Sequence, residues 1–331
     1  MICFTDTTVD PYWNLAAEEY LLTDIQEPVF RLWRNAPSVI VGRYQNAVAE
    51  INADFVRSRG IPVVRRLTGG GAVFHDLGNI NYTFIDKKIP EEDTSAMFRR
   101  FTAPVIAALR GIGVEASLEG RNDLVIDGRK FSGNAVCVHG DRVLQHGTLL
   151  FASSVADLSG ALNTRPEKFI GKGVQSNRSR VTNISRHLPS GPDSMSVEEF
   201  IVYLQDALVG NGGDIVTRGY SAQEKAAIDR LCRDKYSTWE WNFGNSPRYG
   251  FNQSRRFPWG FIEVSLDVAG GVIRSCSIHG DYFFTRPTEE VEQALTGLPH
   301  SYSKVLDALS ALPLNDCFGP VSPEELTSLF F

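Results

Sequence analysis

The sequence predicts an α+β protein with two domains, and three observations support this. The chain has 331 residues, enough for about two domains at roughly 150 residues each. Short strand patterns rich in β-branched residues lie among scattered helix patterns, which is typical of the α+β class. Residues 242–258 lose helical periodicity and are rich in Asn, Gly, Ser and Pro, a composition typical of a linker or a long surface loop. We therefore expect domains over residues 1–244 and 245–331.

Composition excludes several classes of protein. With 33 Lys and Arg against 39 Asp and Glu, the net charge is −6, which argues against a surface made as a whole for nucleic acid or membrane. No apolar run approaches the ~18 residues of a membrane helix, and the N-terminus lacks a secretory signal pattern. We expect a cytoplasmic protein. Its five cysteines are widely separated, so reduced thiols are expected and no zinc site is indicated.

The first third of the chain alternates short helices and strands. Four strands are expected, over residues 29–33, 38–42, 61–67 and 79–85. Three helices are expected, over residues 14–22, 52–60 and about 95–109. Asn14 and Asn52 are residues that commonly cap a helix, and Gly60 would end the second one. Pro104 lies inside the third pattern, so we expect a kink or a break there.

The middle of the chain predicts a strand meander, and helices follow it. Three strands joined by Asp-Gly and Gly-Asp turns are expected over residues 123–126, 129–138 and 143–151, and Asp-Gly between strands is a strong hairpin signal. Two capping boxes, each of which opens a helix, are Ser196 with Glu199 and Ser221 with Glu224. The last part predicts a hairpin around Gly270 and Gly271, and helices from about Glu289 and Ser303.

The densest chemical signal is VVRRLTGGGAVFHD, residues 63–76. Three consecutive glycines remove every Cβ from a loop, so that backbone N–H groups can converge on an anionic or carbonyl oxygen. Arg65 and Arg66 add positive charge beside the loop. The loop suits a carboxylate or a phosphate, although a flexible turn would also contain Gly-Gly-Gly. It is not a P-loop, because no Lys-Ser/Thr follows.

A second signal is GRNDLVIDGRKFSGNA, residues 120–135. Strand alternation predicts that Lys130, Ser132 and Asn134 share one polar face. An ordinary edge strand with a lysine would have the same pattern, and the segment alone favours that simpler interpretation.

A third signal is a basic stretch over residues 165–186, with six basic residues and one acid. It fits a loop that orders on a polyphosphate, and equally a solvated loop or a patch for an acidic protein. The lone His146 of QHGTLL is more often structural than catalytic, and no Ser-His-Asp or Cys-His arrangement is evident. A substrate carboxylate that attacks an α-phosphate needs no such nucleophile; it needs positioning and charge neutralisation.

With these motifs, the sequence resembles the lipoate–protein ligases from end to end. The resemblance implies a large domain with a mixed, mostly antiparallel sheet flanked by helices, and the small C-terminal α+β domain of the larger bacterial members. RRLTGGGAVFHD is similar to the family's lipoate-binding loop, GRNDLVIDGRKFSG to the segment with its essential lysine, and GKGVQSNRSRVTN to its adenylate-binding loop. Leu67 departs from the family's commoner spelling, which leaves the preference between lipoate and octanoate open.

The resemblance also implies roles for individual residues. Lys130 would be the catalytic lysine. The residues implied to bind ATP or the adenylate are Arg66, Gly71, Ala72, Val73, Phe74, Asn122, Asp123, Lys130, Lys172 and Arg178. The residues implied to bind lipoate are Leu15, Glu18, Gly69, Gly70, Gly71, Lys130 and His146. Asp123 is also a candidate magnesium ligand or proton acceptor.

The implied reaction has two steps and uses ATP with Mg²⁺. Lipoate and MgATP would give lipoyl-AMP and pyrophosphate, and a lysine of a lipoyl-carrier domain would then take the lipoyl group. The implied partners are lipoyl domains of 2-oxoacid dehydrogenase acyltransferase subunits and the glycine-cleavage carrier protein, with a monomeric enzyme and no nucleic acid or membrane.

Three alternatives remain open on the sequence. An octanoyltransferase of similar fold would use a cysteine nucleophile without ATP; strand alternation places Cys137 on the face opposite Lys130, which argues against it. A biotin ligase would carry a G-R-G-R loop, where this chain has GGGAVFHD. A binder of carrier domains without catalysis would have no need of an intact Lys130 and Arg66.

Overall fold

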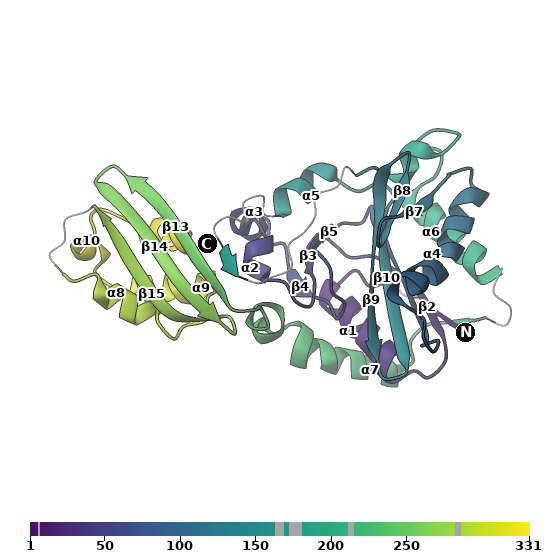
Figure 1. Ribbon diagram of the computed structural model, residues 1–331, viewed down its shortest axis with the longest axis horizontal. Helices are drawn as coiled ribbons and strands as arrows, with labels where there is room; N and C mark the ends of the chain where they lie inside the picture. The colour runs from purple at the N-terminus through teal and green to yellow at the C-terminus, as the bar shows by residue number, and fades with distance from the viewer. Residues whose placement is uncertain (6, 163–168, 172–180, 211–214, 282–285) are drawn as a thin grey trace. The chain divides into compact units, whose positions relative to one another are not determined.

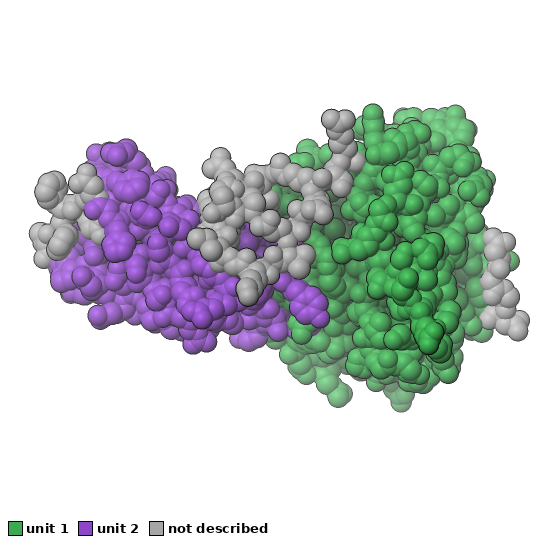
Figure 2. Space-filling model, in the orientation of Figure 1, with its two compact units in different colours: residues 1–43, 59–162, 176–238 green, residues 44–58, 163–175, 239–331 purple. Residues whose placement is uncertain are grey.

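The computed structural model describes the chain except residues 6, 163–168, 172–180, 211–214 and 282–285. The chain forms two compact units, coloured separately in Figure 2. The first unit comprises residues 1–43, 59–162 and 176–238, and the second comprises residues 44–58, 163–175 and 239–331. The division into domains at residues 244 and 245 stays a prediction.

The first unit is built on an eight-stranded mixed sheet. Its strands, in spatial order, are β12 (Val216–Arg218), β1 (Ile2–Phe4), β2 (Val29–Trp33), β6 (Asn79–Lys87), β10 (Arg142–Leu150), β9 (Arg129–His139), β8 (Asp123–Ile126) and β7 (Ser117–Glu119). β1 runs parallel to both of its neighbours, and every other pair is antiparallel. The predicted mixed, mostly antiparallel sheet is confirmed. The β8–β9–β10 meander also matches its expected bounds to within one residue.

Helices and a second sheet cover the two faces of this sheet (Figure 1). α4 (Thr94–Gly111) and α6 (Val197–Gly210) pack on one face, where the main hydrophobic core includes Phe101, Phe131 and Phe200. On the other face lie α1 (Pro11–Thr23) and a three-stranded sheet. That sheet contains β4 (Val63–Arg65), β3 (Ser38–Val41) and β5 (Val73–His75). Remaining elements of the unit are α5 (Val155–Ala161), η2 (Ile184–His187), α7 (Ala222–Leu231) and η3 (Cys232–Tyr236).

The helix ends follow the sequence with two exceptions. Both predicted capping boxes, at Ser196 and Ser221, are present. The cap of α1 is Asp10, not Asn14, whose side chain is used inside the unit. α4 is continuous through Pro104, so the helix does not break there, and the alternative expectation of a kink stays a prediction. Pro104 lies on the exposed face of α4, where water can satisfy the carbonyl that loses its helical partner.

The second unit contains a four-stranded antiparallel sheet that packs against the C-terminal helices. Its strands, in order, are β11 (Phe169–Gly171), β13 (Tyr249–Phe257), β14 (Gly260–Ala269) and β15 (Val272–Asp281). The helical segments are α2 (Ala47–Glu50), α3 (Ala53–Ser58), η4 (Glu240–Gly244), α8 (Glu289–Leu295), α9 (Tyr302–Ser310), α10 (Leu314–Cys317), α11 (Pro323–Thr327) and η5 (Ser328–Phe330). Alternate strand residues and the C-terminal helices share one core. The predicted hairpin around Gly270 is confirmed.

Residues 242–258 are not a linker or a loop, contrary to the expectation from their composition. They contain the end of η4 and the whole of β13. The buried side chains of Tyr249, Phe251 and Phe257 anchor the strand, while the polar residues between them are mostly exposed. Polar composition therefore reflects a sheet with one solvated face. Among the described residues, no helix is both long and apolar enough to cross a membrane.

Candidate active site

One face of the large sheet, the face toward α1, carries a row of polar side chains. Thr83 on β6 lies directly opposite His146 on β10, which in turn lies opposite Ala135 on β9. Directly paired residues of antiparallel strands point to the same face. The sheet register therefore gathers groups that are 63 positions apart in the sequence.

A β-bulge on β9 places Lys130 on this same face. Leu124 pairs with Ser132 while Val125 pairs with Lys130, so Phe131 is an extra residue in β9. The extra residue reverses the alternation. A Cβ at Gly133 would lie 3.2 Å from Nζ of Lys130, which is consistent with both being on one side. The expectation that Lys130 shares a face with Ser132 and Asn134 is thus wrong.

The glycine loop is held by Arg66, whose side chain is 6% exposed. Its NH2 group donates to the carbonyl oxygens of Gly69 and Gly71 at 2.7 and 2.9 Å. Nε donates to Oγ1 of Thr68 at 2.9 Å. Burial lowers the pKa of Arg66 to about 10, although the charge of Glu18 opposes this, so the guanidinium stays charged at neutral pH. Arg66 therefore fixes the shape of the loop.

Two glycines allow this loop to form. Gly70 has a φ of 92°, a region that favours glycine. A Cβ at Gly42, at the end of β3, would lie 2.0 Å from the carbonyl oxygen of Gly70. Arg65, which is fully buried, donates to the carbonyl of Gly42 at 2.9 Å. Arg66 thus binds the glycine loop, and Arg65 binds the backbone beside it at Gly42.

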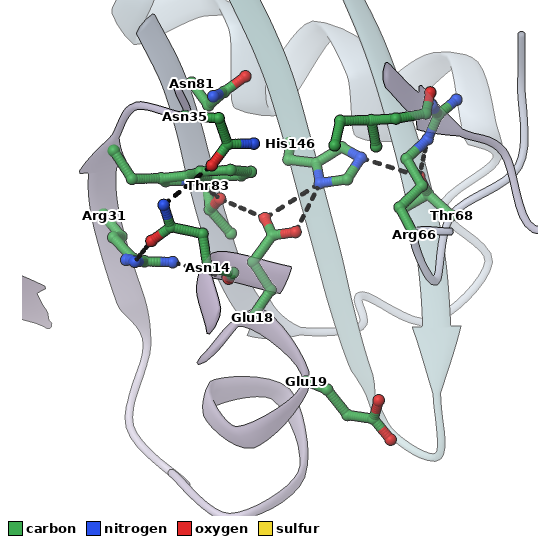
Figure 3. A network of polar contacts seen from close by, with 12 residues as sticks. Asn14, Glu18, Glu19, Arg31, Asn35, Arg66, Thr68, Asn81, Thr83 and His146 are labelled. Carbon is green, nitrogen blue, oxygen red and sulfur yellow. Dashed lines mark hydrogen bonds and ion pairs between the residues drawn. The ribbon is translucent and has the colours of Figure 1, made fainter. Parts of the chain in front are cut away.

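A continuous hydrogen-bonded chain joins the loop to α1 (Figure 3). Oγ1 of Thr68 lies 2.8 Å from Nε2 of His146. Nδ1 of His146 lies 3.0 Å from both carboxylate oxygens of Glu18. Thr83 donates to the same carboxylate at 2.5 Å. An N–H at Nδ1 of His146 can donate to the carboxylate of Glu18, while Nε2 lies within hydrogen-bond reach of the hydroxyl of Thr68.

Glu18 is ionised within this series of hydrogen bonds. Burial alone would raise the pKa of Glu18, but the imidazole of His146 and the hydroxyl of Thr83 outweigh it and lower the pKa. Its neighbour Glu19 points away from the network in Figure 3 and binds Lys235 and Tyr236. The two adjacent glutamates therefore serve different contacts.

A second polar layer supports α1. Nδ2 of Asn14 donates to Oδ1 of Asn35 at 2.9 Å, and the buried Arg31 donates to both the backbone and the side chain of Asn14. Asn35 in turn contacts Nδ1 of His75 at 3.0 Å. Burial, reinforced by the charges of Arg66 and His146, lowers the pKa of His75 to about 3, so His75 is neutral.

Lys130 makes an ion pair with Asp123. Its Nζ lies 2.8 Å from Oδ1 of Asp123, and the two side chains are 28% and 31% exposed. The ammonium can thus be reached by a substrate and is held by one carboxylate. Asn122, the preceding residue, bonds to Asn134 rather than to solvent.

The predicted site residues therefore fall into two groups. Arg66, the glycines, His146 and Glu18 belong to one hydrogen-bonded network, and Lys130, Asp123 and Asn122 belong to a second. Leu15, Ala72 and Phe74 are buried, and Val73 is half-buried. Lys172 and Arg178 lie outside the described residues. Within the described residues, no cluster of three or more His, Cys, Asp or Glu could hold a metal ion.

The bulge also overturns the argument about Cys137. Because the alternation reverses at Phe131, Cys137 is on the same face as Lys130. Burial raises the pKa of Cys137 to about 12, and the charges of Glu18 and Glu19 contribute. The group is therefore a thiol at neutral pH, and a thiol is a poor nucleophile.

Two features of the site escaped prediction. Thr83 donates a further hydrogen bond to Glu18, and Asn134 binds Asn122 to the sheet. A signal for Thr83 exists, since it is the polar residue inside the otherwise apolar run YTFI. No local pattern marks the bulge, because it depends on which residues of β8 pair with β9.

A loop whose shape is fixed by an arginine and an accessible ammonium are groups of the kind that suit an enzyme with anionic substrates. Residues 10–209 match the lipoyl protein ligase A/B catalytic domain, and residues 246–330 match the bacterial lipoate protein ligase C-terminus. The chain belongs to the lipoyl protein ligase A/B family and carries its bacterial C-terminal domain.

Individual relatives agree with this assignment. Lipoate-protein ligase LplJ of Bacillus subtilis is 40% identical over 97% of this chain and 97% of its own length. A structure from the analysis of a bi-partite lipoate protein ligase and its E2 lipoyl domain from Thermoplasma acidophilum has a TM-score of 0.63 and 27% identity, covering 74% of this chain and 96% of that one. A lipoate-protein ligase A bound with ATP has a TM-score of 0.61 and 27% identity, covering 74% and 98%.

Proposed function

We propose that this chain is an ATP-dependent lipoate–protein ligase. It activates lipoate with MgATP to lipoyl-AMP and pyrophosphate, and then transfers the lipoyl group to a lysine of a lipoyl domain. The observation that carries the proposal is the accessible ammonium of Lys130, on a chain whose family relatives act on lipoate and ATP. Octanoyl transfer through Cys137 is disfavoured by its protonated thiol.

In the first step, a carboxylate oxygen of lipoate attacks the α-phosphorus, and the bond to the β-phosphate oxygen breaks. Both reactants are anionic, so their repulsion opposes the approach. The ammonium of Lys130 binds both anions, which replace Asp123 as its partner. Its positive charge then stabilises the transition state at the phosphorus. No protein nucleophile is required.

In the second step, the amine of the carrier lysine attacks the lipoyl carbonyl, and AMP leaves with the former carboxylate oxygen. Lys130 stabilises the negative charge that develops on the carbonyl oxygen. Asp123 accepts the proton released by the amine or assists in binding Mg²⁺, which is held mainly by the phosphates of the substrate.

The remaining binding roles use residues of both networks. The adenylate contacts Arg66, Asn122 and Lys130 and the run from Gly71 to Phe74, and Lys172 and Arg178 are further residues that bind it. The lipoyl group lies against Leu15 and Glu18 of α1, His146 and the loop Gly69–Gly71. The hydrogen bonds from Glu18 through His146 to Thr68 support this assignment, because they connect α1 with the glycine loop.

Further proposals concern the cellular context. The carrier proteins are the lipoyl domains of 2-oxoacid dehydrogenase acyltransferase subunits and the glycine-cleavage carrier protein. The enzyme is a cytoplasmic monomer, with a catalytic domain over residues 1–244 and an accessory domain over residues 245–331. The structural analysis of the Thermoplasma ligase and its E2 lipoyl domain supports the carrier class.

Isotope exchange tests the function. The protein is incubated with ATP, lipoate and labelled pyrophosphate, and label is expected to enter ATP only when lipoate is present. Transfer from an octanoyl carrier without exchange would instead identify a transferase. Absence of both reactions would leave a binder of carrier domains.

A further inference from the structure

Asn134 is a buried hydrogen-bonding centre on the α4-facing side of β9. Its Oδ1 accepts bonds from the hydroxyl of Tyr82 and from Nε2 of Gln145, the latter at 2.7 Å. Its Nδ2 donates to the carbonyl of Asn122 at 3.1 Å and to Oγ of Ser132 at 3.3 Å. Asn134 is 2% exposed, so these atoms bind the protein rather than a substrate.

The same residue binds Asn122 through its backbone. The N–H of Asn134 donates to the carbonyl of Asn122 at 3.0 Å. Nδ2 of Asn122 donates back to the carbonyl of Asn134. Together with the side-chain bond from Asn134, two hydrogen bonds hold the peptide carbonyl immediately before Asp123, and a third holds the side chain of Asn122.

Asp123 then transmits this constraint to the other face of the sheet. It pairs with Gly133 in the β8–β9 register, and its carboxylate lies 2.8 Å from Nζ of Lys130. Because the bulge turns Lys130 away from the side chain of Asn134, the two do not share a face. Asn134 can influence the ammonium through Asn122 and Asp123.

The neighbouring strand makes room for this centre. A Cβ at Gly147 would lie 2.2 Å from Oδ1 of Asn134 and 2.7 Å from the ring of Tyr82. Burial also raises the pKa of Tyr82 well above its ordinary value, so its hydroxyl remains protonated and can donate to Asn134. Both features maintain the acceptor role of the Asn134 oxygen.

We infer that Asn134 is a positioning residue for Lys130, acting through the Asn122 peptide and the Asp123 carboxylate. It holds Asp123 where the ion pair forms, and so sets the place of the ammonium before substrates arrive. The significance for catalysis rests on the proposed function of Lys130, whereas the positioning itself can be tested without it.

Amine labelling of the full chain, without ATP or lipoate, tests the positioning. A trace of acetic anhydride is added at constant pH, and mass spectrometry gives the acetylation of Lys130 relative to the exposed Lys304. The carboxylate of Asp123 occupies one side of the Lys130 amine at 2.8 Å and so hinders its approach to the reagent. We therefore expect Asp123→Ala to raise the ratio about two- to fivefold, as for loss of a partly exposed ion pair. Asn134→Ala keeps the two bonds made by its backbone and should raise the ratio by a smaller factor.

The double variant decides whether the two residues act in series. Asn134→Ala with Asp123→Ala should label no faster than Asp123→Ala alone, since residues in one chain of contacts are not additive. Multiplied effects, or an unchanged ratio in folded Asn134→Ala, would overturn the inference. If Asn134→Ala does not fold, Asn122→Ala, at a half-buried position, provides the same comparison.

A matched control separates positioning from general loosening. Tyr203→Phe removes a hydrogen bond of 2.7 Å between α6 and α4 in the same unit and should leave the Lys130 ratio unchanged. In the exchange reaction, Asn134→Ala should lower kcat more than it raises the KM for lipoate. If Asn134→Ala alters the labelling of Lys130 but the unsubstituted protein shows no exchange, the proposed function is refuted and the positioning role of Asn134 still stands.

Discussion

At the scale of single residues, the proposed reaction depends most on the charge of Lys130. The Lys130→Ala variant should lose lipoate-dependent exchange by about 10²-fold or more, as when one preorganised stabilising group is removed from a reaction site. Its circular dichroism spectrum and urea midpoint should change little, because the side chain is partly exposed and has one ion-pair partner among the described residues. Lys304→Ala, on exposed α9, is the matched control. Exchange at the unsubstituted rate in Lys130→Ala would remove Lys130 from the mechanism.

Glu18 gives a prediction about pH. Its folded pKa lies below the ordinary value of 4.5, so the ionised form stabilises the fold above pH 4.5, and this contribution is lost as pH falls through the folded pKa. Glu18→Gln should reduce the free energy of unfolding by about 1–3 kcal/mol at pH 7, through loss of hydrogen bonds to a charged group.

Urea unfolding at pH 7 and at several acidic values measures this effect. The difference between the unsubstituted protein and Glu18→Gln should shrink as the acidic limb is reached. A difference that stays constant with pH would show that the charge of Glu18 is unimportant to stability. Glu198→Gln, on an exposed ion pair with Arg34, is the control and should change stability little.

At the scale of elements, the contact between the end of β3 and the glycine loop is the tightest feature of the site. Gly42→Ala would drive a methyl group against the carbonyl oxygen of Gly70. That oxygen belongs to the backbone, so it cannot turn aside as a flexible side chain could. We expect a loss of about 1–3 kcal/mol, typical of overpacking, with a larger fall in exchange activity because the loop must shift.

Thermal unfolding and exchange rates together measure the two effects. Gly210→Ala is the matched control, since that position lies in α6 with open space around its Cα and alanine there should stabilise by up to about 1 kcal/mol. If Gly42→Ala were as active and as stable as the control variant, the close packing of the loop would have no importance.

The elements also show how far sequence patterns reach. Hydrophobic alternation and capping residues located the β8–β9–β10 meander and the starts of α6 and α7, because these signals are local. The face of Lys130 was mispredicted, since the bulge at Phe131 exists only through pairing with β8. β13 was mistaken for a linker because its polar side chains face solvent, and the tie between Thr68, His146 and Glu18 joins three distant segments that no spacing relates.

At the scale of the whole molecule, the central claim is that the substrate carboxylate attacks the phosphorus and leaves one of its oxygens in AMP. The test uses lipoate with both carboxylate oxygens replaced by oxygen-18, together with ATP and an unmodified lipoyl domain. Mass spectrometry of the AMP released after transfer should find one oxygen-18 atom in its phosphate. Lipoylated carrier accompanied by unlabelled AMP, or an acyl group found on Cys137, would contradict the account.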